Sequence, residues 1–156
     1  MDWVDLLFTF RGRINRARFW LAALVYIVVT IVAGILASLG GSDMVAGLVN
    51  SAANLVTFVS GLFVATKRLH DRGRSGWWLV LFYFAPSILF GIGIALALFG
   101  WAGDASGTGR IGVLFLAAGL AVGIWAFVEL GCLRGTVGPN RYGPDPLAGP
   151  TDAVTH

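Results

Sequence analysis

Four long apolar stretches dominate the pattern of hydrophobic and polar positions along this chain. They cover residues 19–39, 44–65, 77–99 and 111–133. Each is close to the roughly 20 residues that a helix needs to cross a ~30 Å hydrocarbon core. In lipid every backbone polar group must be bonded within the protein, and the short alternating segments of a barrel are missing from the sequence. The pattern therefore predicts an all-α membrane protein, a bundle of four transmembrane helices.

Short polar segments separate the apolar stretches. Residues 40–43 (GGSD) predict a tight turn, so we expect the first two helices to form an antiparallel hairpin. Residues 67–76 predict a basic loop. Beyond residue 134 glycine and proline are frequent, which excludes a regular helix there. We expect a single four-helix transmembrane domain over residues 1–147 and a flexible C-terminal tail over residues 148–156.

A shorter apolar segment precedes the first predicted span. It includes Trp3, Leu6, Phe8 and Phe10, and four arginines follow it before the span begins. An apolar stretch next to basic residues is typical of a helix that lies along the lipid headgroups. We therefore predict an interfacial N-terminal segment, with a disordered arm as the alternative.

Composition and charge agree with a membrane protein and add its orientation. The 156 residues are 57% hydrophobic and 12% charged, which is too apolar for a soluble domain of this size. Of the 11 basic residues, all except Arg110 lie in the N-terminal arm, the middle loop or the C-terminal segment. The positive-inside rule then places both termini in the cytoplasm. Because the basic residues lie against lipid, their excess does not indicate nucleic acid.

Polar residues inside the spans are few. Asn50, Asn54 and Thr57 recur at helical spacing on one face of the second span, and Glu129 is the acidic residue inside the fourth. They could line a pore or a ligand site, since intramembrane charges are often functional. We favour hydrogen bonds between helices for the asparagine face and an ion pair with a cytoplasmic arginine for Glu129.

Glycines in the fourth span suggest a helix contact. Gly119 and Gly123 form a G-x-x-x-G pair, a spacing that lets two helices approach closely, either inside the bundle or between copies of the chain.

Three motifs lie on the predicted cytoplasmic side. They are FRGRINRARFW at residues 10–20, KRLHDRGRSGWW at residues 67–78 and GTVGPNRYGPDP at residues 135–146. Their arginines and histidine supply hydrogen-bond donors, and their aspartates supply acceptors. Their glycines allow close approach of the backbone.

The three motifs resemble those of the domain of unknown function 805 family, the YhaH-like proteins. Members show F-x-G-R-x-x-R-x-x-F/Y-W, R-R-L-H-D-x-G-x-S-G-W-W and G-T-x-G-x-N-x-Y-G-x-D-P in the same order. Lys67 stands where the central motif begins with arginine. The resemblance covers essentially the whole chain. It implies a small multi-pass protein of the bacterial inner membrane, and it implies no activity, substrate or catalytic residue.

We expect the three motifs to meet at one cytoplasmic surface. The candidate site residues there are Arg13, Asn15, Arg16, Arg68, His70, Asp71, Asn140, Arg141 and Asp145. One interpretation is a cap in which an ion network fixes the helix ends. A second is an anion pocket for a phospholipid headgroup or a phosphorylated ligand. A third is loose attraction to anionic lipid.

The sequence shows no catalytic constellation. His70 and Asp71 are adjacent, but no serine or cysteine nucleophile is placed with a base. His70, Cys132 and His156 are too scattered for a zinc site, so we expect no metal and no cofactor.

The leading hypothesis is a non-enzymatic membrane protein whose cytoplasmic face binds a protein partner or an anionic lipid headgroup. It could act as an accessory subunit of a membrane complex or as a homo-oligomer. The alternative is a small transporter or channel lined by the asparagine face and Glu129.

The charge asymmetry predicts where the termini lie. A protease-cleavable tag at either end should be protected in intact spheroplasts and cleaved only after the membrane is opened. Cleavage of either tag from the outside would contradict the orientation.

Overall fold

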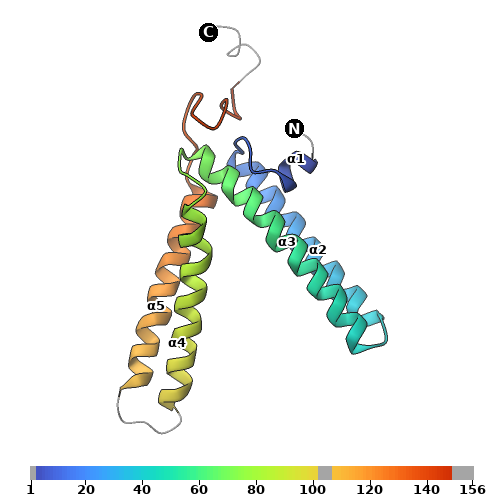
Figure 1. Cartoon of the computed structure of the whole chain (residues 1–156), viewed down its shortest axis with the longest axis vertical. Helices are drawn as coiled ribbons and strands as arrows, with labels where there is room; N and C mark the ends of the chain where they lie inside the picture. The colour runs from blue at the N-terminus through green and yellow to red at the C-terminus, as the bar shows by residue number, and fades with distance from the viewer. Residues whose placement is uncertain (1–2, 102–106, 149–156) are drawn as a thin grey trace. The chain divides into compact units, whose positions relative to one another are not determined.

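In the computed structural model the described residues, 3–101 and 107–148, are almost all helical (Figure 1). The elements in chain order are α1 Trp3–Phe8, α2 Arg16–Leu39, α3 Asp43–Asp71, the π-helix η1 Val80–Phe84, α4 Ala85–Trp101, α5 Thr108–Phe127 and the π-helix η2 Val128–Cys132. Within these residues the only β-type pairing is an isolated bridge between Asn140 and Gly143. The predicted flexible tail, apart from its first residue, lies outside the described residues.

Four helical segments are long and apolar enough to cross a membrane. They are Arg16–Leu39, Asp43–Asp71, Val80–Gly100 and Thr108–Cys132. The prediction of an all-α protein with four spans is confirmed. Large apolar side chains on these helices are exposed, as expected for surfaces that lipid covers.

The chain divides into two compact units. One comprises Met1–Gly76 together with Arg134–His156, and the other comprises Trp77–Leu133. The expectation of a single domain over residues 1–147 stays a prediction.

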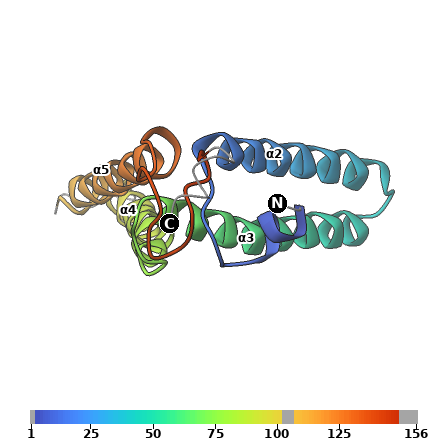
Figure 2. The same cartoon turned by 90° about the horizontal axis from the view of Figure 1, so that it is seen from above.

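In the first unit α2 and α3 form the predicted hairpin and run side by side (Figures 1 and 2). Gly41 makes the reversal with a φ of +70°, a region that glycine enters without strain. Ser42 then caps α3, its side chain accepting a 3.3 Å hydrogen bond from the backbone N–H of Val45. The hairpin is therefore encoded locally in the predicted turn.

The basic loop begins later than predicted. Residues 67–71 are helical, so α3 ends at Asp71 and not near residue 65. Gly73, with a φ of +70°, closes the helix: its N–H bonds to the carbonyl of His70 at 3.0 Å, and that of Arg74 bonds to the carbonyl of Leu69 at 2.9 Å. This is the Schellman arrangement. The charged composition misled the prediction because these charged side chains are buried and partnered.

In the second unit α4 and α5 pack closely through small residues. A Cβ at Gly112 would lie 2.6 Å from the backbone nitrogen of Ala97 and 2.8 Å from the carbonyl oxygen of Gly93. Of the predicted glycine pair, Gly119 contacts α4, whereas a Cβ at Gly123 would meet nothing within 4 Å. The closest approach is thus nearer the start of α5 than the pair suggested.

We predict that Gly112→Ala destabilises the α4–α5 hairpin by about 1–3 kcal/mol, because backbone atoms of α4 occupy the space of the new methyl group. Gly123→Ala is the control, since it adds the same methyl group to open space on the same helix. Thermal melting in detergent would measure both. Equal melting temperatures for the two variants would contradict the close packing.

Candidate functional site

A buried ion network lies at the end of α3. Nε and Nη2 of Arg13 donate to Oδ1 of Asp71 at 3.2 and 3.1 Å, and Nη1 of Arg68 donates to Oδ2 of the same carboxylate. The three side chains are at most 4% exposed. One carboxylate therefore holds two guanidinium groups away from water, with each oxygen assigned to a different arginine.

Arg13 also binds the C-terminal segment. Its Nη2 donates to the carbonyl of Thr136 at 2.6 Å and to Oγ1 of the same residue at 3.2 Å. Its Nη1 donates to the carbonyls of Gly138 at 2.7 Å and Gly143 at 3.3 Å. One guanidinium thus joins residues of all three sequence motifs within the first unit.

The C-terminal segment in turn completes the end of α3. The backbone N–H and the hydroxyl of Thr136 both donate to the carbonyl of Asp71, at 2.8 and 3.0 Å. Nδ2 of Asn140 donates to the carbonyl of His70 at 3.0 Å and to Oγ1 of Thr136 at 3.0 Å. These donors satisfy carbonyls that a helix end leaves without intrahelical partners.

Two aromatic rings add a second contact between α3 and the C-terminal segment. The rings of His70 and Tyr142 stack with centroids 3.8 Å apart and planes within 4°. The guanidinium of Arg141 lies 4.7 Å from the Tyr142 ring, and its Nη2 donates to the carbonyl of Gly73 at 3.3 Å. Nδ1 of His70 is buried and has no hydrogen-bond partner among the residues described.

Asp145 organises a turn of the C-terminal segment. Its carboxylate accepts 2.9 Å hydrogen bonds from the backbone N–H groups of Leu147 and Gly138, and these bonds lower its pKa from the ordinary value of 3.8. The ionised carboxylate therefore stabilises this turn at neutral pH. That contribution is lost as the pH falls through the pKa of the folded protein.

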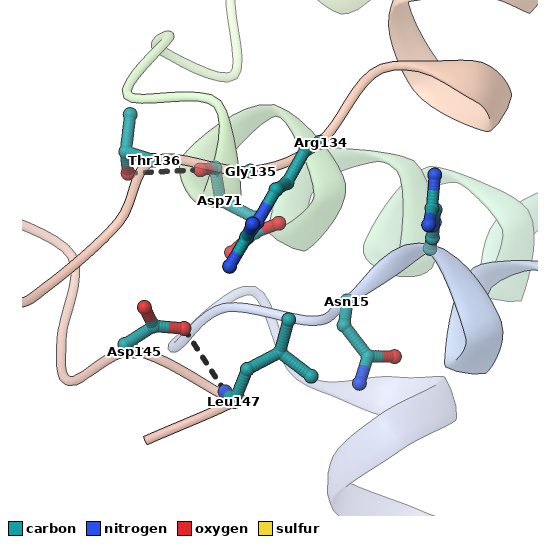
Figure 3. Close-up of a pocket in the computed structure, with 8 residues that line it drawn as sticks. Asn15, Asp71, Arg134, Gly135, Thr136, Asp145 and Leu147 are labelled. Atoms are coloured by element: carbon teal, nitrogen blue, oxygen red, sulfur yellow. Dashed lines mark hydrogen bonds between the residues drawn. The ribbon is translucent and has the colours of Figure 1, made fainter.

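A cleft of about 150 Å³ opens beside this network (Figure 3). Its lining residues are Asn15, Arg16, Asp71, Arg134, Gly135, Thr136, Asp145 and Leu147. Asn15 is the N-cap of α2, its Oδ1 accepting from the N–H of Arg18 at 2.9 Å. The Arg134 side chain points into the cleft between Asp71 and Asp145 in Figure 3.

The cleft has a surplus of donors. Asp71 is engaged by two arginines and Asp145 by two backbone N–H groups. Arg16 and Arg134 are both exposed, and neither guanidinium donates a hydrogen bond to another residue in the described part of the chain. The cleft therefore presents two available cations next to two carboxylates that are already bonded.

Gly135 shows how tightly the C-terminal segment lies on the network. A Cβ there would overlap the carboxylate of Asp71. That carboxylate is held by Arg13 and Arg68, so it cannot move aside cheaply. A glycine is required at this position for steric reasons, not for its backbone conformation.

The intramembrane candidates do not gather in one unit. In α3, Asn50 donates to the carbonyl of Ala46 at 3.1 Å and Thr57 donates to that of Ala53 at 2.9 Å, so both use their own helix. Asn54 is exposed. Glu129 is buried in η2, which belongs to the second unit.

All nine predicted residues of the motif surface belong to the first unit. Seven of them, Arg13, Arg68, His70, Asp71, Asn140, Arg141 and Asp145, surround the end of α3 and the C-terminal segment, while Asn15 and Arg16 line the cleft. The prediction missed Arg134 and Thr136. Thr136 lies in the third motif, and Arg134 directly precedes it, so proximity to the motif was the available signal.

Among the described residues there is no group of three His, Cys, Asp or Glu side chains that could hold a metal.

Comparison with known proteins identifies the family. The model of the family described as "Protein of unknown function (DUF805)" matches residues 7–144. The chain belongs to this family. The resemblance drawn from the three motifs is thereby confirmed.

The DUF805 relatives of this chain include proteins of Escherichia coli K12. The chain is 28% identical to the inner membrane protein YhaH over 90% of its own length and 89% of that protein. It is 34% identical to the uncharacterized protein YiiR, over 89% and 86% of the two chains, and 29% identical to the inner membrane protein YhaI, over 90% and 87%. No solved structure matches. With four apolar helices, the chain is a multi-pass protein of the bacterial inner membrane.

We predict that Gly135→Ala lowers the free energy of unfolding by about 1–3 kcal/mol, because the new methyl group collides with a carboxylate clamped by two arginines. Val137→Ala, at an exposed position two residues along the same segment, should change stability by less than about 0.5 kcal/mol. Melting in detergent measures both variants. If Gly135→Ala melts like the wild type, the C-terminal segment does not lie on the Asp71 carboxylate.

Proposed function

We propose that this DUF805 protein is non-enzymatic and binds the phosphate of an anionic phospholipid headgroup in the cleft between Arg16 and Arg134. The observation that carries the proposal is the pair of guanidinium groups that line one cleft without donating to a described residue. Guanidinium groups form strong, bidentate hydrogen bonds with phosphate oxygens.

The neighbouring carboxylates support an anion over a cation as the ligand. The carboxylate of Asp71 is paired with the guanidinium groups of Arg13 and Arg68. Both carboxylate oxygens of Asp145 accept hydrogen bonds from backbone N–H groups. A cation entering the cleft would meet arginines and no available carboxylate. The cleft also lies at the N-terminus of α2, where the helix dipole favours negative charge.

The position along the membrane helix supports lipid as the source of the phosphate. Arg16 is the first residue of a span, so the cleft is at the level where headgroups lie. The predicted orientation puts it in the cytoplasmic leaflet, where anionic lipids attract basic residues. Because α3 and the C-terminal segment are fixed to each other by Arg13, the cleft is formed before a ligand arrives.

Lipid binding to the purified, delipidated protein tests the proposal. Native mass spectrometry with phosphatidylglycerol should show that Arg16→Gln/Arg134→Gln binds at least about tenfold more weakly than the wild type, because each charge-assisted bond is worth about 1.5–3 kcal/mol. Arg11→Gln is the matched control, since it removes an exposed arginine of the same N-terminal arm that does not line the cleft. That control should bind within about twofold of the wild type.

Three results would contradict the proposal. Unchanged binding by the double variant would remove the cleft as the site. An equal loss in Arg11→Gln would show diffuse attraction to the basic surface. Equal binding of phosphatidylglycerol and phosphatidylcholine, together with a protein that co-purifies through Arg16 and Arg134, would favour a protein partner and an accessory role.

A further inference from the structure

The short N-terminal helix α1 is held by polar groups of the long helix α3. Nζ of Lys67 donates to the carbonyls of Asp5 and Leu6, the latter at 3.1 Å. Oγ of Ser60 donates to the carbonyl of Leu7 at 2.8 Å. Lys67 and Ser60 are 0% and 1% exposed. These buried donors cap the C-terminal carbonyls of α1 and fix its position against α3.

The apolar side chains of α1 divide into two sets. Leu6 is buried in a cluster with Ile14, Ala22 and Val64. Trp3, Val4 and Phe8 of α1 lie outside that cluster and are 55%, 69% and 49% exposed. Phe10, two residues beyond α1, is 53% exposed. Since the polar capping holds α1 in place, Trp3, Val4 and Phe8 form an exposed apolar patch on a fixed element, and Phe10 adds to this patch.

The patch continues onto the membrane-spanning surface of α2. A groove of about 190 Å³ between α1 and the start of α2 is lined by Trp3, Leu6, Arg18 and Leu21. Trp20 and Leu21 are each 43% exposed at the same end of the span. The groove is apolar along α1 and has a guanidinium at one wall, which matches the upper part of an acyl chain next to a lipid phosphate.

We propose that α1 and Phe10 insert into the boundary between headgroups and acyl chains of the leaflet in which α2 begins. The lipid bilayer is the occupant that the charges favour. Arg11 is exposed and directly follows Phe10, and Arg18 lines the groove with Trp3, so a second copy of the chain would bring like charges together, whereas anionic lipid would neutralise them. Because Lys67 and Ser60 cap its carbonyls, α1 is folded and held against α3 before it meets lipid. It differs in this from an amphipathic helix that folds only on contact with lipid.

Collision-based electron paramagnetic resonance tests the insertion in liposomes, and it does not depend on the Arg16–Arg134 cleft. In a Cys132→Ser background, a spin label is placed at Val4→Cys on the patch. The control is Asp5→Cys, the next residue, where an acidic and exposed side chain stands in the wild type. The Val4 label should collide several-fold more with oxygen than with a water-soluble nickel chelate, and the Asp5 label should show the reverse.

Two results would overturn the proposal. Equal access of the nickel chelate to both labels would place α1 in water. Exclusion of both colliders from the Val4 label would show that protein, such as a second copy, covers the patch.

A second variant tests the fixed position. Lys67→Met removes the ammonium that caps α1, so the label at Val4 should become markedly more mobile; Ser60→Ala is the milder variant for the same test. An unchanged spectrum in both Lys67→Met and Ser60→Ala would contradict the fixing of α1 by these two residues, because α1 would then be held by other contacts.

Discussion

The structure of the first unit depends on one buried ion pair, between Arg13 and Asp71. Removing both charges from water is costly, and the attraction compensates only when the remaining donors and acceptors are also bonded. Here they are. The arginine places its other donors on backbone carbonyls of the C-terminal segment, and the second carboxylate oxygen is taken by Arg68. Three segments distant in sequence are thereby tied to one point.

This arrangement explains why polar residues gather where α2 begins and α3 ends. The Arg13 pair orders the arm before α2 and the segment after residue 134, and both contribute walls to the cleft. The sequence offered a cap and an anion pocket as alternatives; the structure shows the cap, and the cleft proposed as the anion pocket lies directly beside it. The buried network holds the structure, and the exposed Arg16 and Arg134 are available to a ligand.

Much of the fold was predictable because lipid imposes simple rules. Spans follow from the length of apolar stretches, and the α2–α3 turn follows from Gly41 and Ser42. The convergence of the three motifs was also predicted. The end of α3 was not, because charged residues normally indicate a loop, and only the tertiary partners of Lys67, Arg68 and Asp71 make a helix favourable there. The roles of Gly112 and Gly135 depend on which backbone or side-chain atoms come within reach of each, and one sequence does not contain that information.

A double-mutant cycle on Arg13 and Asp71 tests the central claim most directly, with free energies of unfolding measured in detergent. Arg13→Gln and Asp71→Asn should each cost about 3–5 kcal/mol, because each leaves a buried charge without its partner. The double variant should cost less than the sum of the two by more than about 1 kcal/mol. Additive losses would contradict the account, since the two side chains would then stabilise the protein independently.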